Sequence, residues 1–306
     1  MNMEMNKRIV TELCLSDVVF DFEKRVHHNL NIVMRPLMRW TMGGNVSEAG
    51  WECLSESIRI TPKVYPEFDY VVCYNNMTPD KLKRLQSFGV DLYEQTEDQI
   101  GVSFEFDQST TESVGNHAWK LCPLRLRPDA HEIWVDNDII LWERIPEIEQ
   151  FLADGLPIVS QTWSRELYGS FDSDIPKGCS ICAGFFGLPP NYPFQQIIDS
   201  LLVGKGPLKN YDEQGMIASM IVNNKDGWIG IHPFHLNQLG WWERVKKLPM
   251  GGHFIRLNTG TNLSWETYKM TTHPSPKIVN SENWQYKDKH IIEHGPVKNR
   301  AFRVVP

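Results

Sequence analysis

Short apolar runs alternate with longer stretches of helical periodicity along most of this 306-residue chain. Runs of four to eight apolar residues, rich in β-branched and aromatic side chains and bounded by turn residues, are typical of strands. The predicted strands cover 31–40, 68–74, 90–93, 133–135, 156–160, 181–188, 228–232 and 253–257. The predicted helices cover 46–60, 78–89, 116–127, 146–153, 193–203 and 212–222.

Several of these predictions rest on local start and stop signals. Asn45 is a candidate N-cap for the first helix. Thr78 followed by Pro79 predicts an N-cap and first helical position, and Gly89 ends that helix. Pro36 implies that the first strand is an edge strand or is interrupted. The acidic, turn-rich segment 94–115 is predicted to be an exposed loop.

The alternation of strands and helices over the first 160 residues predicts the fold class. It favours an α/β fold with a mostly parallel central sheet that is covered by helices on both faces. The chain contains no internal repeat and no low-complexity linker, so we expect a single domain over 1–274. The polar segment 275–306 is predicted to be a C-terminal tail.

Composition narrows the possible partners. A formal net charge of −7 without any run of Lys or Arg argues against nucleic acid and against a polybasic membrane contact. No stretch approaches the roughly 20 apolar residues of a membrane span. The six cysteines mostly stand singly within apolar patterns, which predicts reduced thiols and a cytoplasmic location.

The most informative pattern is an acidic triplet inside an apolar run. Ile133, Trp134 and Val135 lead directly into Asp136-Asn137-Asp138, and Ile139-Ile140-Leu141 follow. Carboxylates at the end of a buried strand are costly unless something pairs with them, and a divalent cation is the usual partner. Ligands of open α/β sheets also gather outside the carboxyl ends of strands. The triplet therefore predicts a metal site; the alternative is an exposed turn between two strands.

These residues resemble a family. The Trp119-Lys120-Leu121 segment and the strand ending in Asp136-Asn137-Asp138 are similar to nucleotide-sugar glycosyltransferases of the GT-A fold, which carry a DxD motif. Cys182-Ala183-Gly184-Phe185-Phe186-Gly187-Leu188 resembles their small-residue strand beside the acceptor, and Asp212-Glu213-Gln214 the acidic start of a later helix. Among them, the retaining, family 8-like enzymes are the most similar.

The resemblance implies a division of labour. A nucleotide-binding half over about 30–160 would precede an acceptor half over about 161–274, and Mn²⁺ or Mg²⁺ would neutralise the diphosphate of a nucleoside diphosphate sugar, with UDP favoured. Asp138 would be the main metal ligand, and Asp136 would bind the metal or the ribose. His253 falls where a third ligand would lie, although the longer Gly and Lys-Pro-Trp pattern that follows this histidine in the family is absent here.

Further site residues follow from the same resemblance. Asp212 and Glu213 would bind acceptor hydroxyls of a glycan or glycoconjugate or act as the base, whereas two acids in a first helical turn are also favoured by the helix dipole alone. A donor-binding role is expected for the residues at the predicted strand ends and phosphate site. These are Arg39, Thr41, Asn75, Lys120, Asp136 and Gly184.

Alternative functions remain at the level of sequence. A phosphohydrolase of the haloacid dehalogenase type also ends a strand in Asp-x-Asp, but places it on the first strand. A sugar-1-phosphate nucleotidyltransferase needs a longer glycine loop than Gly43-Gly44-Asn45. A glycosyltransferase-like domain that binds carbohydrate without turnover is the non-enzymatic alternative. The Cys179-x-x-Cys182 pair lacks a second ligand pair, which disfavours a zinc site.

Overall fold

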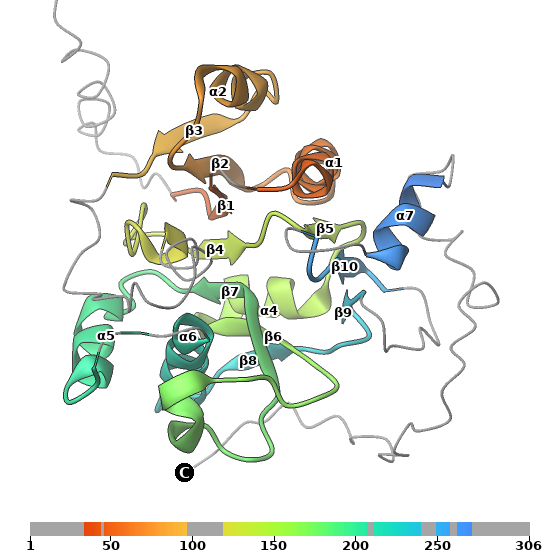
Figure 1. The fold of residues 1–306 in the computed structure, drawn as a ribbon. Helices are drawn as coiled ribbons and strands as arrows, with labels where there is room; N and C mark the ends of the chain where they lie inside the picture. The colour runs from red at the N-terminus through yellow and green to blue at the C-terminus, as the bar shows by residue number, and fades with distance from the viewer. Residues whose placement is uncertain are drawn as a thin grey trace, which may run out of the picture. The chain divides into compact units, whose positions relative to one another are not determined.

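The structure is a computed structural model that describes residues 34–43, 46–96, 119–206, 208, 211–239, 249–257 and 262–270. The elements below all belong to the unit that begins at Arg35 (Figure 1). The prediction of one domain over 1–274 stays a prediction, and the predicted tail over 275–306 lies outside the described residues.

A seven-stranded sheet in the order β3-β2-β1-β4-β7-β6-β8 forms the centre of the fold. The β3, β2, β1 and β4 strands are parallel, β7 is antiparallel to both β4 and β6, and β8 is parallel to β6. The strands are β1 (Leu37–Met42), β2 (Asp69–Tyr74), β3 (Asp91–Glu94), β4 (Glu132–Val135), β6 (Ile158–Gln161), β7 (Ile181–Leu188) and β8 (Ile229–Ile231).

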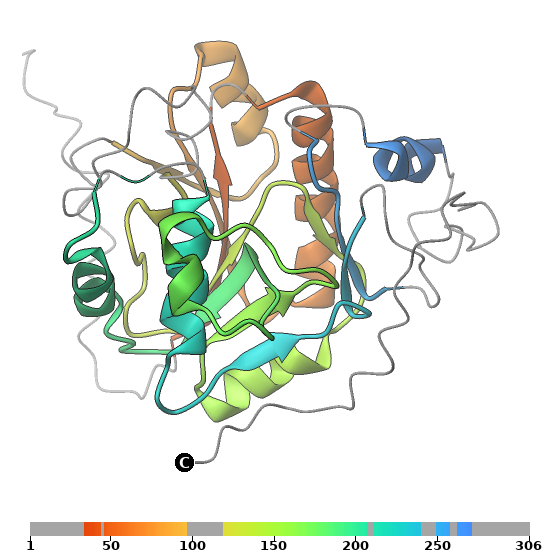
Figure 2. The same cartoon turned by 60° about the horizontal axis from the view of Figure 1, so that its bottom comes forward.

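Helices cover both faces of this sheet, because successive strand side chains point to opposite faces and both sets are apolar. Ile133 and Val135 pack with α1 and α4, whereas Trp134 packs with α5 and α6 on the other face. Figure 2 shows α1 on one side of the strands and α5 and α6 on the other. The helices are α1 (Glu48–Val64), α2 (Pro79–Gln86), α4 (Pro146–Asp154), α5 (Phe194–Leu202), α6 (Asp212–Val222) and α7 (Leu263–Met270).

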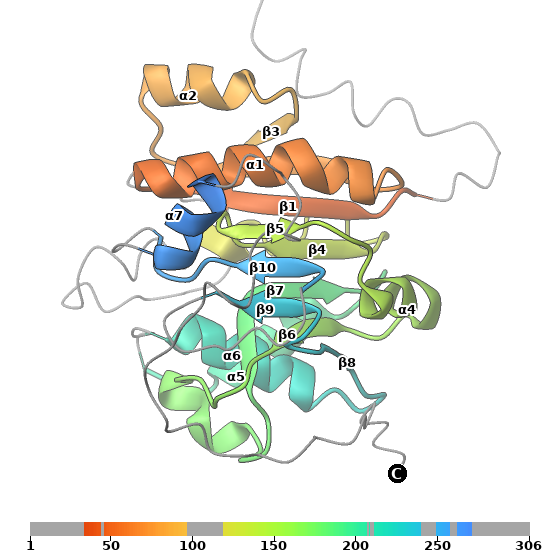
Figure 3. The ribbon, with the colours of Figure 1, turned by 90° about the vertical axis from the view of Figure 1, so that its right-hand side faces the viewer.

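A second, three-stranded sheet lies where the chain continues beyond β4. Its order is β5-β10-β9, formed by β5 (Ile139–Leu141), β10 (Gly251–His253) and β9 (Leu236–Gln238). Figure 3 shows these short strands together, with α7 next to β10. Phe254, Trp265 and Tyr268 share an apolar cluster with Ile140, which anchors α7 to this sheet. A side chain at Gly252 would collide with Leu239 and Trp142, so the close packing here requires glycine.

The predicted α/β fold with a mostly parallel central sheet is confirmed. Thr78 caps α2 by accepting from the backbone of Lys81, with Pro79 at the first position, as predicted. β1 begins after Pro36 and lies between β2 and β4, so the proline neither interrupts the strand nor marks an edge strand, and both alternatives predicted from it are wrong. The first helix is capped by Ser47, while Asn45 lies outside the described residues.

Two element predictions are wrong. The helix predicted over 116–127 is, in its described part, a single turn η2 (Trp119–Leu121) followed by irregular chain. Its carbonyls bond to buried side chains: Gln95 donates to Trp119 and Cys122, and Arg39 donates to Lys120. The strand predicted over 253–257 ends at His253, after which the backbone forms a turn.

A buried charge network fixes the start of β4. Glu132 is fully buried and forms ion pairs with Arg39 at 3.0 Å and Arg125 at 3.1 Å. Its carboxylate also accepts from the backbone of Leu126 and Arg127 at 3.1 Å. Arg39 lies 4.5 Å above the Trp134 ring. Because a buried charge is tolerated only when it is paired and hydrogen-bonded, Glu132 ties the irregular segment after η2 to the sheet.

The state of the cysteines and the apolarity of the helices leave this description of the fold unchanged. Cys53, Cys73, Cys122, Cys179 and Cys182 are free thiols. Across the part of the chain that the structure describes, no helix is long and apolar enough to cross a membrane. The cytoplasmic location stays a prediction.

Candidate metal centre

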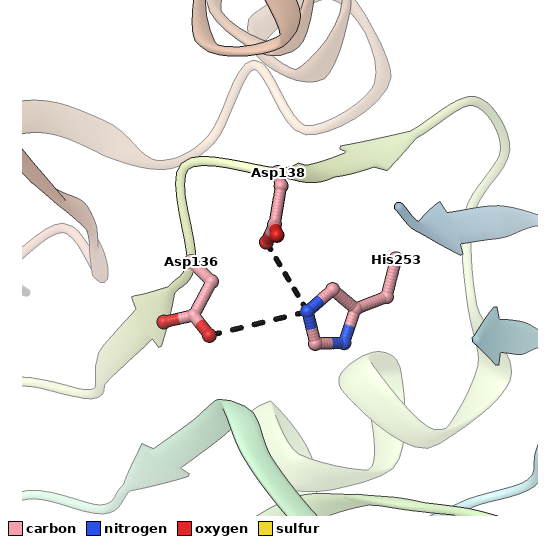
Figure 4. A group of neighbouring side chains, drawn as sticks. All are labelled: Asp136, Asp138 and His253. Atoms are coloured by element: carbon pink, nitrogen blue, oxygen red, sulfur yellow. Dashed lines mark ion pairs between the residues drawn. The ribbon is translucent and has the colours of Figure 1, made fainter. Parts of the chain in front are cut away.

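The acidic triplet forms the turn between β4 and β5. The backbone N–H of Asp136 donates to the Gly184 carbonyl at 2.8 Å, which continues the pairing of β4 with β7 by one residue. The N–H of Ile139 then donates to the Asp136 carbonyl at 3.1 Å, which closes a tight turn. Asp136 and Asp138 are therefore held on a short, hydrogen-bonded segment, with their carboxylates facing the same space (Figure 4).

His253 reaches this turn through the small sheet. β10 pairs antiparallel with β5, which places His253 opposite Ile139. The N–H of Phe254 donates to the Asp138 carbonyl at 2.8 Å, and the N–H of Leu239 donates to the His253 carbonyl at 2.7 Å. The backbone at His253 is consequently held from both sides of β10, which places its imidazole next to the two aspartates.

These three side chains form one cluster, which we call the acid–histidine cluster. His253 Nε2 lies 3.1 Å from Asp138 Oδ1 and 4.0 Å from Asp136 Oδ2. One ligand atom from each residue lies within 4.8 Å of the others. Figure 4 shows Nε2 turned toward both carboxylates and the other ring nitrogen turned away. Asp138 and His253 are buried, whereas Asp136 is partly exposed, so the cluster opens to solvent on one side.

The donor set fits a divalent cation. Asp138 Oδ1 is buried, and its polar neighbour is His253 Nε2 at 3.1 Å, which can donate to it only when that nitrogen carries a proton. Burial opposes a charge on His253, but the Asp138 carboxylate outweighs it and raises the pKa of His253 well above its usual value. A proton on Nε2 therefore occupies, in the absence of metal, the position that a cation would take between imidazole and carboxylates.

Gly184 leaves the space that this cluster occupies. A Cβ at this position would lie 2.6 Å from His253 Cε1 and 2.9 Å from Asp136 Oδ2, both closer than real contacts allow. Gly184 was predicted to bind the donor, and the structure places it against two of the three candidate ligands. Its role here is to allow the close approach of backbone and side chains.

Replacing Gly184 with alanine is expected to weaken Mn²⁺ binding by about tenfold or more, because the added methyl displaces His253 and Asp136. Electron paramagnetic resonance of free Mn²⁺ during titration measures this loss. Gly178→Ala is the matched control, since a Cβ there meets nothing within 4 Å. Equal Mn²⁺ affinity of Gly184→Ala and wild type would contradict the assignment of this space.

Lys120 adjoins Asp136, the partly exposed member of the cluster. Its Nζ lies 2.7 Å from Asp136 Oδ1 and 3.3 Å from Glu213 Oε1, and it donates to the Ala183 carbonyl at 3.2 Å. Burial works against its charge, but the carboxylates of Asp136 and Glu213 raise the pKa of Lys120 above its usual value. A cation thus adjoins the cluster, held between the carboxylates of Asp136 and Glu213.

The two acids at the start of α6 lie in different surroundings. Glu213 is buried and reaches the cluster through Lys120. Asp212 accepts from the backbone N–H of Ser170 at 2.6 Å, at the start of η3 (Gly169–Asp174), and so ties that turn to α6. The residue that precedes α6, Tyr211, has a left-handed backbone (φ 70°), which is uncommon for a side chain of this size. Asn210, a candidate cap, lies outside the described residues.

The remaining predicted residues come from β1 and from the end of β2. Arg39 is fully buried and supports the η2 turn, where its guanidinium donates to the carbonyls of Lys120 and Pro123. Asn75 is buried at the end of β2 and donates to Gln95 at 3.2 Å. Thr41 lies near the end of β1, opposite Cys73 on β2. The structure therefore brings Asp136, Asp138, His253, Lys120, Glu213 and Gly184 together. The parallel pairing of Trp40 with Val135 also places Thr41 next to Asp136 in register, whereas Arg39 and Asn75 are bound to other side chains.

Sequence reasoning missed one contact residue. Cys182 lies on β7, and its sulfur contacts the ring of His253 on β10. The sequence suggested no contact with a histidine for either cysteine of the Cys179-x-x-Cys182 pair. The only signal was the position of Cys182 two residues before Gly184 in the small-residue strand.

Comparisons with known proteins give fold-level likeness only. No family model and no curated protein matches the sequence. Solved structures that are similar include the galactosyltransferase LgtC with donor and acceptor sugar analogues (10% identity, 66% of this chain, 75% of that chain, TM-score 0.46). Apo glycosyltransferase GlyE of Streptococcus pneumoniae TIGR4 is also similar (13% identity, 81% of this chain, 62% of that chain, TM-score 0.49). So is apo mouse xyloside xylosyltransferase 1 (10% identity, 74% of this chain, 99% of that chain, TM-score 0.47). At such values, activity has to be argued from the residues of this chain.

Proposed function

We propose that this chain is a metal-dependent glycosyltransferase, which moves a sugar from a nucleoside diphosphate donor to a hydroxyl of a carbohydrate or glycoconjugate. The observation that carries the proposal is the acid–histidine cluster at the carboxyl end of β4, with Lys120 beside it. Two carboxylates, one imidazole and a neighbouring ammonium form a site for a cation together with a phosphate-bearing ligand.

Asp138, Asp136 and His253 would hold Mn²⁺ or Mg²⁺. Oxygen ligands with a single imidazole suit these ions better than a softer metal, because no thiolate belongs to the cluster. The ion, when bound, acts as a Lewis acid that stabilises charge on the departing diphosphate. Lys120 would add a second positive charge on the exposed side, where the phosphates would lie.

Of the two acids on α6, we assign the role toward the acceptor to Glu213. The Glu213 carboxylate pairs with Lys120, and Lys120 also pairs with Asp136, so a single side chain links Glu213 to the acid–histidine cluster. Asp212 is engaged by the η3 backbone instead. Glu213 would orient the acceptor hydroxyl or accept its proton. Donor-binding roles for Thr41 and Asn75, and the preference for UDP, stay predictions.

Nucleotide-dependent thermal stabilisation tests the proposal. The full chain is mixed with UDP, GDP, CDP or ADP, or with the corresponding nucleotide sugars, each with and without Mn²⁺. We expect one diphosphate to raise the unfolding temperature only when Mn²⁺ is present, since ligands that bind the native state stabilise it by mass action. The matching nucleotide sugar then serves as donor in transfer assays with carbohydrate acceptors.

The same samples separate the competing functions. Stabilisation without any transfer or hydrolysis of the donor would indicate a carbohydrate- or nucleotide-binding domain. Release of orthophosphate from a sugar phosphate, with no response to nucleotides, would indicate a phosphohydrolase. Absence of a shift with every nucleotide, with and without Mn²⁺, would refute the proposal.

A further inference from the structure

Cys182 contacts the one ring nitrogen of His253 that does not face the aspartates. Its Sγ lies 3.7 Å from His253 Nδ1, and the backbone N–H of Gly184 donates to the same sulfur at 3.4 Å. The side chain is nearly fully buried. It belongs to β7, which is paired on both sides within the central sheet, so the position of the sulfur is set by the core of the fold.

These contacts define what the sulfur can do. The Gly184 N–H donates to Sγ, and the bond between Sγ and Nδ1 can run in either direction according to the tautomer of His253. With a cation on Nε2 the ring proton has to lie on Nδ1, and Sγ is then its acceptor. An acceptor opposite Nδ1 favours the imidazole tautomer that carries its proton on Nδ1. In that tautomer the lone pair lies on Nε2, the nitrogen that Figure 4 shows turned toward Asp136 and Asp138.

We propose that Cys182 is a positioning residue for the metal centre: its sulfur accepts a hydrogen bond from Nδ1–H of His253 and thereby aims the Nε2 lone pair at the cation. This inference rests on the proposed metal site. Cys182 itself is not a ligand, because the group of side chains with ligand atoms within 4.8 Å of one another comprises Asp136, Asp138 and His253. Outer partners of this kind commonly contribute ten- to a hundredfold to metal affinity.

Mn²⁺ binding to the full-length protein, followed by electron paramagnetic resonance without any sugar substrate, tests the inference. Cys182→Ala removes the acceptor and is expected to weaken Mn²⁺ binding by about tenfold. Cys182→Ser keeps an acceptor and is expected to lose less affinity. Cys179→Ala is the matched control, because this half-buried thiol lies three residues before Cys182 and packs against the apolar cluster that contains Phe171 and Ile175, and the variant should bind Mn²⁺ like wild type.

A double-mutant cycle separates positioning from a general effect on packing. If Cys182 acts through His253, Cys182→Ala has no further effect on Mn²⁺ affinity in a His253→Ala background. Additive losses, or equal affinities of Cys182→Ala and wild type, would overturn the inference. Thermal unfolding without metal shows whether each variant is folded, and Cys182→Ser replaces the alanine variant in the cycle if the latter is not. Failure of wild type to bind Mn²⁺ would instead refute the proposed metal site.

Discussion

Replacing Asp138 with alanine is expected to abolish metal-dependent nucleotide stabilisation and to lower sugar transfer about a thousandfold. The variant loses the carboxylate closest to His253 Nε2, and stabilisation of a departing diphosphate by a bound metal amounts to several kcal/mol in the transition state. The fold should persist, because the substitution removes a side chain from the turn between β4 and β5 and no apolar core volume. Thermal shift with nucleotide and Mn²⁺, followed by a transfer assay, measures both effects.

Two further variants make this result specific. Asp138→Asn keeps the shape of the side chain and removes its charge, so it should resemble Asp138→Ala in metal binding. Asp226→Ala removes an exposed carboxylate from the turn after α6 and should behave like wild type. Wild-type transfer by Asp138→Ala would show that Asp138 is not a metal ligand in the reaction.

Replacing Glu132 with alanine is expected to reduce the free energy of unfolding by about 3–5 kcal/mol. The loss arises because Arg39 and Arg125 then remain as buried charges without their shared carboxylate, and the backbone N–H groups of Leu126 and Arg127 lose their acceptor. Chemical denaturation measures the change, which corresponds to a fall in unfolding temperature of roughly 10 °C.

A graded series distinguishes this network from an ordinary surface effect. Glu132→Gln keeps an acceptor oxygen for the two N–H groups and should be less destabilising than Glu132→Ala. Glu143→Ala removes an exposed carboxylate just after β5 and should change stability by no more than about 0.5 kcal/mol. Equal stability of Glu132→Ala and wild type would mean that the buried charges find other partners.

The long apolar strands could be predicted from the sequence because their pattern is local. β7 coincides with its predicted run, and β4 and β6 match theirs to within two residues, since a strand buried on both faces is mostly apolar. The three-residue strands β9 and β10 carry no such signal. β5 continues the apolar run after the acidic triplet, but its pairing with β10, like that of β10 with β9, depends on distant partners. The segment after Trp119 has helical periodicity, but Gln95 and Arg39 bind its carbonyls and hold it in an irregular path.

The residues of the candidate site likewise fall into two groups, those that a local sequence pattern reveals and those that depend on contacts between distant segments. Asp136 and Asp138 were evident because carboxylates interrupt an apolar run, and that is a property of adjacent residues. His253 was suggested only by family resemblance, and its place beside Asp138 follows from the pairing of β10 with β5. The contacts of Lys120 with Glu213, and of Cys182 with His253, join separate elements and have no sequence signature. Arg39 shows the converse, because a charged residue near a strand end is here part of the core.

The pairing of β10 with β5 also determines when the candidate metal ligands come together. The two aspartates enter the chain at β4, whereas the histidine arrives only after the whole segment that supplies β6, β7, β8 and α6. Closing so long a loop costs chain entropy and makes this contact one of high sequence separation. The set of candidate ligands is therefore complete only when β10 has docked on β5. A chain that ends before residue 251 contains the acidic triplet but lacks the imidazole, so ion binding reports on completion of the fold.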